Sequence, residues 1–246
     1  MRFLSQLFLK HSELFLMKRI SLFLFAKFIL AFCSIVYELV LAQALSAFLE
    51  NTVLRYSMTI GLYLFCIGMG ALFAEGKFRK DSLKTLLWIE VLLTFFGGFS
   101  LGWFFLMDAV NFSRMLFLFG SHFFIIIIGI LTGFEVPLLM DLVGQERKNS
   151  EGIVLAFDYT GAFAGSCMFA FVFYPKTGLV LAALLTGMLN ALSGMILFLG
   201  WARPRKAVSR SSFVCFGLQS FLLATIVLCL MHANEINTYL MSLYLS

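Results

Sequence analysis

Four acidic residues stand out because each lies within a run of apolar residues long enough to cross a membrane. They are Glu38, Glu90, Glu135 and Asp158. A carboxylate near the centre of a bilayer costs about 2.5–3.5 kcal/mol on insertion scales. Side chains of this kind usually face one another, a partner group or a water-filled cavity. They are therefore the first candidates for binding or acid–base chemistry.

The depth of three of these acids predicts a shared level. At about 1.5 Å per helical residue, Glu90 lies about two turns past the cytoplasmic start of its span. Glu135 precedes the cytoplasmic end of the next span, and Asp158 follows the start of the span after that, each by a similar distance. We predict a polar cavity open to the cytoplasm, with Glu38 deeper. Other side chains expected to line it are Tyr37, Tyr159 and Asn190.

Three kinds of chemistry fit this arrangement. Carboxylates beside aromatic rings suit a cationic or amine-bearing ligand. Buried carboxylates also bind protons readily and could form a proton relay. Alternatively, the acids pair with Lys27, His122 or Asn190 and only join helices. Pro137, two residues after Glu135, either frees a backbone carbonyl and widens the pocket or is a tolerated kink.

The composition predicts the elements that must position these residues. Of 246 residues, 61% are hydrophobic and 13% are charged, and the mean hydropathy is +0.98. In soluble domains about 45–50% of residues are apolar and about 25% are charged. The fold class is therefore all-α, a polytopic transmembrane bundle, because open strands would leave backbone groups unpaired in lipid. Seven spans of about 20 residues are predicted at 23–48, 57–74, 83–107, 115–140, 153–174, 179–201 and 213–231.

The basic residues predict the orientation of the bundle. Of 18 Lys and Arg, all except Arg55, Arg114 and Lys176 lie before or at the start of the first span, or around the loops after the second, fourth and sixth spans. By the positive-inside rule the N-terminus is cytoplasmic. The net charge of +5 is thus a topology signal, and no nucleic-acid partner is expected. We expect an integral protein of a bacterial inner (plasma) membrane, with the lipid bilayer as its first partner.

The chain divides into three parts on this view. Residues 1–19 have apolar residues at helical spacing and predict an amphipathic helix on the cytoplasmic surface. The alternative is that the true start is Met17. Residues 20–233 form the seven-helix domain, and residues 234–246 form a short C-terminal tail.

Glycines four residues apart predict close contacts between helices, since small residues let helix backbones approach in a membrane. The pairs are Gly98/Gly102, Gly129/Gly133 and Gly161/Gly165.

No metal or cofactor site is expected from the sequence. The 5 Cys and 3 His lack metal-ligand spacing, and the chain has no glycine-rich phosphate loop after a strand and no recognisable Ser/His/Asp set.

Five segments, in order, resemble the family of spermidine synthase-like (polyamine aminopropyltransferase) membrane proteins. They include YELVL at 37–41, GFEVPLL at 133–139 and LAFDYTGA at 155–162, together with 57–70 and 187–190. Three of the four acids lie within these segments. The resemblance covers most of the chain between residues 37 and 190.

The resemblance implies seven helices followed by a soluble aminopropyltransferase domain that holds decarboxylated S-adenosylmethionine and the polyamine. The sequence ends at Ser246, just after the last span, so we expect that domain to be absent. The expected function is a non-catalytic binding or transport-like module for an amine-bearing or lipid-linked molecule. It would serve a separately encoded soluble synthase-like enzyme. The alternative is an intramembrane transferase subunit with Asp158 or Glu135 as general base.

Overall fold

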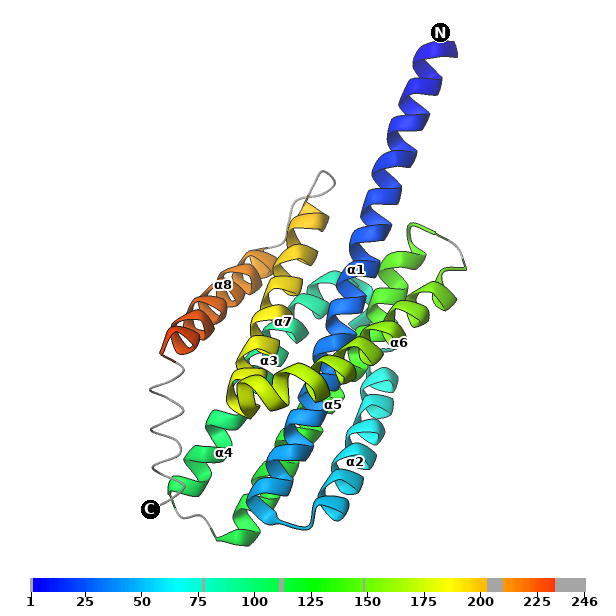
Figure 1. The fold of residues 1–246 in the computed structure, drawn as a ribbon. Coiled ribbons are helices and arrows are strands. Elements are labelled where there is room, and N and C mark those ends of the chain that lie inside the picture. Colours follow the sequence, from blue (N-terminus) through cyan, green and yellow to red (C-terminus); the bar gives the residue numbers. More distant parts are fainter. Residues whose placement is uncertain (1, 77, 111–112, 148, 203–209, 233–246) are drawn as a thin grey trace.

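The computed structural model describes residues 2–76, 78–110, 113–147, 149–202 and 210–232. These residues are helical or connect helices, and no strand occurs among them, which confirms the all-α class. The tail at 234–246 lies outside the described residues, as do most side chains of segment 1–19. The amphipathic character of that segment therefore stays a prediction. Its backbone is the first part of one uninterrupted helix, which Figure 1 shows extending beyond the bundle.

The helices follow the predicted spans closely. Their bounds are α1 Arg2–Leu49, α2 Thr52–Phe73, η1 Phe78–Asp81, α3 Ser82–Gly98, α4 Ser100–Ala109, α5 Arg114–Gly144, α6 Glu151–Met168, η2 Phe169–Thr177, α7 Gly178–Ala202 and α8 Arg210–Met231.

Five helical segments are long and apolar enough to cross a membrane, or up to six if one bent pair is counted as a single span. The bent pair is α3 and α4, which meet at an angle of 41°. At the bend, Ser100 Oγ donates a hydrogen bond to the carbonyl of Gly97 at 2.7 Å. This bond satisfies a backbone acceptor close to the break in the helix. The sequence predicted one unbroken span here.

The segment Glu151–Gly200 counts as one continuous helical stretch, where the sequence predicted two spans. Its middle, η2, has π-helical geometry and contains Pro175. The direction of the chain changes at Gly178, whose φ of 75° is readily adopted by glycine. Figure 1 shows the result, with α6 and α7 on either side of α1 and η2 crossing it.

Helix α1 is the centre of the bundle and contacts α2, α5, α6 and α7. Close backbone contacts hold α2 against α5. A Cβ added at Gly70 would meet the carbonyl oxygen of Ile130, and one added at Gly133 would meet that of Ile67. The close packing predicted for Gly133 is thus confirmed, whereas Gly102 has no neighbour within 4 Å of such a Cβ.

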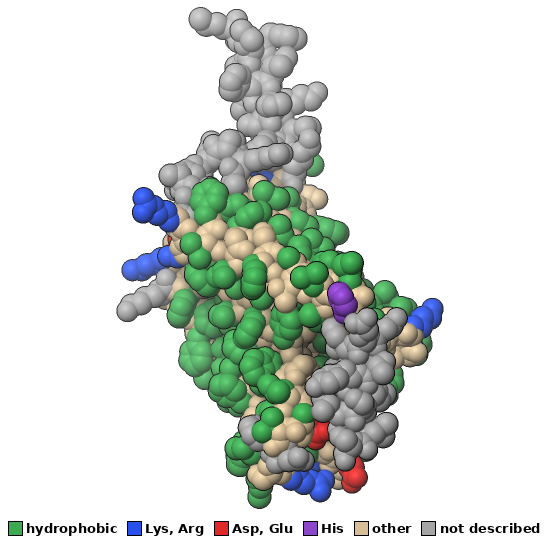
Figure 2. Space-filling model, turned by 90° about the vertical axis from the view of Figure 1, so that its left-hand side faces the viewer, with side chains coloured by type: hydrophobic (Ala, Val, Ile, Leu, Met, Phe, Trp, Pro, Cys, Tyr) green, Lys and Arg blue, Asp and Glu red, His purple; other side chains and the backbone are tan. Residues whose placement is uncertain are grey.

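The outer faces of α2 and α8 carry large apolar side chains. Phe65 is 65% exposed on α2, and Phe221 is 68% exposed on α8. Figure 2 shows hydrophobic side chains covering much of one face of the molecule, with the Lys and Arg side chains toward its edges.

Candidate functional site

Lys27 lies between two of the predicted acids, on a different helix from each. Its Nζ is 2.7 Å from Asp158 Oδ1 and 3.4 Å from Glu135 Oε2. The side chains of Lys27 and Glu135 are 2% and 1% exposed, and that of Asp158 is 21% exposed. The three residues form a charged triad, in which Asp158 is the member most accessible from outside.

A glycine one turn after Asp158 explains how the triad assembles. A Cβ added at Gly161 would meet the carbonyl oxygen of Phe28, the residue after Lys27. The absence of a side chain at Gly161 therefore lets the backbone of α6 lie directly against α1. This contact brings Asp158 to Lys27, while α5 supplies Glu135 from the other side.

Glu90 belongs to a second polar centre, where α3 meets α7 and α8. The amide Nδ2 of Asn190 donates to Glu90 Oε2 at 2.9 Å, to the Glu90 carbonyl at 3.1 Å and to Thr94 Oγ1 at 3.2 Å. Gln219 Nε2 also donates to Thr94 Oγ1, at 3.0 Å. Glu90 lies within electrostatic range of Glu135 and Lys27, so the two centres are neighbours.

The remaining predicted site residues lie apart from the triad. Glu38 is on α1, eleven residues from Lys27, which places it about 16 Å further along the helix. Tyr37 is 1% exposed and packs its ring against α3, where a Cβ added at Gly97 would meet it. Tyr159 is 70% exposed, so it does not join the buried centre as expected.

Three of the four acids are therefore engaged with partners from other helices. This corresponds to the pairing alternative for Glu135 and Asp158 through Lys27, and for Glu90 through Asn190. His122 does not take part, since its Nδ1 lies 2.8 Å from the carbonyl of Leu118.

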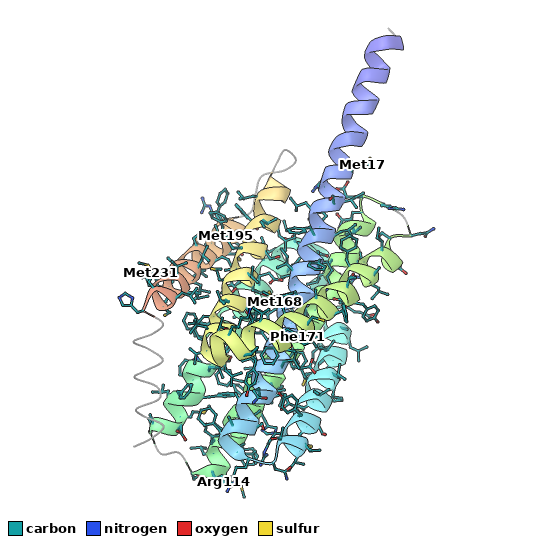
Figure 3. The ribbon with its side chains drawn as sticks, viewed as in Figure 1. Met17, Arg114, Met168, Phe171, Met195 and Met231 are labelled. Carbon is teal, nitrogen blue, oxygen red and sulfur yellow. The ribbon has the colours of Figure 1, made fainter. Side chains whose placement is uncertain are left out.

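Two cavities of a few hundred cubic ångströms lie elsewhere among the described residues. One of about 290 Å³ is lined by Glu50, Asp108 and Arg114 among others, near the ends of α1 and α4 and the start of α5. Figure 3 labels Arg114 at that end of the bundle. Another of about 370 Å³ is an apolar groove lined in part by Trp103 and Phe221. Neither is lined by the acids of the predicted cavity.

Sequence reasoning named Lys27 as a pairing partner of the acids, and the structure gives it that role. It missed two members of the second centre, Thr94 and Gln219. A signal was present for both, because Thr94 follows Glu90 by one helical turn and Gln219 is an amide within an apolar helix. Among the described residues, no group of three or more His, Cys, Asp or Glu side chains could hold a metal ion.

The chain is similar to curated proteins named polyamine aminopropyltransferase. It is 32% identical over 215 residues to one from Leptospira interrogans, which covers 86% of this chain and 41% of the relative. It is also 32% identical over 173 residues to polyamine aminopropyltransferase 2 of Ralstonia nicotianae, and this match covers 69% of this chain and 34% of the relative. A polyamine aminopropyltransferase from Oceanobacillus iheyensis is 32% identical over 177 residues, and this match covers 68% of this chain and 33% of the relative. The spermidine synthase-like relationship is confirmed.

The chain spans about two fifths or less of the length of these curated relatives. No family model and no solved structure matches it. The names of the relatives contradict the expected non-catalytic binding or transport-like module, because they denote transferases and so point to a catalytic enzyme. That expectation depended on where the given sequence ends, which is not evidence about catalysis.

Proposed function

We propose that the protein acts in the transfer of aminopropyl groups to polyamines, as a transferase whose helices span a membrane. The similarity of most of the chain to proteins named polyamine aminopropyltransferase supports the activity. The triad of Lys27, Glu135 and Asp158 supports a role for the helical bundle itself, because the reaction that this name describes requires an amine to be bound and deprotonated.

We propose seven crossings with the N-terminus in the cytoplasm of a bacterial cell. The long apolar helices and the exposed apolar faces of α2 and α8 support insertion in a bilayer. The concentration of Lys and Arg around alternate loops supports the orientation.

The chemistry of the transfer defines what the triad would do. The acceptor amine forms a new C–N bond to the aminopropyl group, the bond between that group and its donor breaks, and one proton leaves the amine nitrogen. An amine can attack only as the free base, so a carboxylate at hydrogen-bond distance can serve as the general base. Asp158 is the better placed of the two acids, because its side chain is 21% exposed while that of Glu135 is 1% exposed.

The observation that carries this proposal is the position of the Lys27 ammonium group. An alkylammonium is held between two carboxylates from two other helices, at 2.7 and 3.4 Å. The end of a polyamine is also a primary ammonium on an alkyl chain. The two carboxylates therefore offer the negative charge and the acceptor geometry that a polyamine end requires, with Lys27 as the internal counterpart of the substrate.

Measuring aminopropyl transfer to a polyamine by the purified protein in lipid tests this proposal. We expect Asp158→Asn to lower the rate about 10²–10⁴-fold, the usual contribution of a general base, and Glu135→Gln to lower it less. Tyr159→Phe is the matched control, because its side chain is adjacent in sequence but exposed. Absence of transfer by the unaltered protein, or full activity of Asp158→Asn and Glu135→Gln, would overturn the proposal.

A further inference from the structure

The junction of α3, α7 and α8 contains buried polar side chains that the proposed transfer does not use. Glu90 and Ser193 are fully buried, Asn190 is 1% exposed and Gln219 is 3% exposed. All four lie among apolar residues of helices that we place in a membrane. Each therefore needs a partner for every polar atom.

The hydrogen bonds at this junction fix the orientation of both amides. Asn190 Nδ2 faces three oxygens, from the side chain and carbonyl of Glu90 and from Thr94. Gln219 Nε2 faces the hydroxyl of Thr94. Since these nitrogens are donors, the opposite end of each amide is an acceptor oxygen.

The atoms left without a partner are mostly acceptors. Glu90 Oε1, Asn190 Oδ1 and Gln219 Oε1 are buried and accept no hydrogen bond, and Ser193 Oγ is also unpartnered. An unsatisfied buried polar group costs about 1–3 kcal/mol, and more if it is charged. Three such oxygens on one junction indicate an occupant that carries a positive charge or donates hydrogen bonds.

The charges of the two neighbouring centres give an independent argument. Among the side chains that the structure describes, the carboxylates of Glu90, Glu135 and Asp158 share this region with one ammonium group, that of Lys27. If all were ionised, the acids would exceed the base by two charges in an apolar interior. An uncompensated buried charge is strongly unfavourable. Glu90 is the one of the three acids without an ion pair to Lys27, so it is where a further positive charge is needed.

The available space limits what can supply this charge. A cavity of about 10 Å³ is lined by Gln219, Gly194 and Met195, but not by Glu90 or Asn190; Figure 3 labels Met195 on α7. The cavity adjoins Glu90, because a Cβ added at Gly194 would lie 3.2 Å from the Cβ of Glu90. That is room for about one particle of the size of water. The ammonium end of an organic amine, with its attached carbon chain, does not fit.

We propose that Glu90, Asn190 and Gln219 form a buried site for one small monovalent cation, a proton or a sodium ion, that neutralises Glu90. Carboxylate and amide oxygens are the ligand type that hard cations prefer. The other ionisable groups near Glu90 are Lys27, Cys33 and Tyr37 of α1 and Glu135 of α5. From α7 and α8, the junction receives the amides of Asn190 and Gln219 and the hydroxyl of Ser193, and the thiol of Cys215 lines the adjoining cavity.

Two measurements on the purified protein in detergent test this site and distinguish the two cations. The first is the midpoint of thermal unfolding in sodium chloride against choline chloride at equal ionic strength. The second is the infrared carbonyl band of a protonated carboxylic acid, recorded without sodium. A saturable rise of the midpoint that is specific for sodium, and that Glu90→Gln abolishes, identifies a sodium site. A carboxylic acid band that Glu90→Gln removes identifies a proton site.

Glu50→Gln is the control, since Glu50 is exposed at the end of α1 and should change neither reading. If Glu90→Gln does not fold, the variant Gln219→Leu is used in its place. We expect Gln219→Leu to weaken the effect of sodium on the midpoint or to shift the carboxylic acid band. An unaltered protein that responds equally to sodium and choline and shows no acid band would overturn the proposal. The proposal would also be overturned if neither Glu90→Gln nor Gln219→Leu changed the sodium effect or the carboxylic acid band. These readings do not depend on transfer activity, so they are independent of the proposed function.

Discussion

Lys27 of α1 and Asp158 of α6 form an ion pair with Nζ and Oδ1 2.7 Å apart, and the lysine side chain is 2% exposed. Removing one partner of a buried ion pair is costly, because the remaining charge has no compensation. We predict that Lys27→Met lowers the free energy of unfolding by about 3–5 kcal/mol. Thermal or denaturant unfolding in detergent measures this change.

A combined variant separates the loss of charge from the loss of packing at Lys27. Adding Glu135→Gln and Asp158→Asn to Lys27→Met removes all three charges and should recover much of the stability. Lys176→Met is the control for removing an exposed lysine. If Lys27→Met unfolds at the same midpoint as the unaltered protein, the ion pair is not a determinant of the fold.

The contact between α2 and α5 leaves no room for a side chain at Gly70. A Cβ there would meet the backbone oxygen of Ile130, and this neighbour cannot move without displacing α5. We predict that Gly70→Ala destabilises the protein by about 1–3 kcal/mol, as overpacking does. Gly68→Ala on the same helix is the matched control, since nothing lies within 4 Å of its Cβ position. Equal unfolding midpoints for the two variants would contradict the predicted contact.

The hydroxyl of Tyr63 links three helices. It lies 3.2 Å from the Ser34 carbonyl of α1 and 3.1 Å from Thr132 Oγ1 of α5. We predict that Tyr63→Phe lowers the free energy of unfolding by about 0.5–1.5 kcal/mol, the usual net value of a hydrogen bond. Tyr159→Phe removes an exposed hydroxyl and should have no effect in the same measurement; a similar loss for both would contradict this role for Tyr63.

The apolar groove beside α8 offers a test of membrane insertion. Trp103 lines this groove and is 39% exposed. If the groove faces lipid, brominated phospholipid should quench the fluorescence of Trp103 in a variant carrying Trp88→Phe and Trp201→Phe. A variant that retains only Trp88, whose Nε1 donates to Ser211 at 3.0 Å, should be quenched less. Equal emission of the Trp103 variant in brominated and ordinary lipid would contradict exposure to acyl chains.

The extent of the helices could be predicted from sequence because apolar length is a local property. The predicted span 115–140 lies within α5, Arg114–Gly144, and the span 23–48 lies within α1, Arg2–Leu49. The bend at Phe99 was not predicted, because the sequence is similarly apolar before and after this residue. The hydrogen bond at the bend runs from the Ser100 side-chain hydroxyl to the Gly97 carbonyl.

The sequence gives the position of each candidate residue along its helix but not the direction in which its side chain points. Asp158 and Tyr159 are adjacent in sequence, so their depths are nearly equal. Successive residues of a helix, however, point about 100° apart. Asp158 therefore meets Lys27, while Tyr159 is 70% exposed. Which face turns inward depends on the contact of Gly161 with α1, and that contact is a property of the assembled bundle.

The stretch Glu151–Gly200 carries Asp158 on one arm and Asn190 on the other. It is thus fastened by salt bridge to Lys27 at one point and by amide contacts to Glu90 at another. Any sliding or rotation of this hairpin would disturb both fastenings together. One piece of chain therefore bridges the two polar centres, each of which it anchors with a different arm.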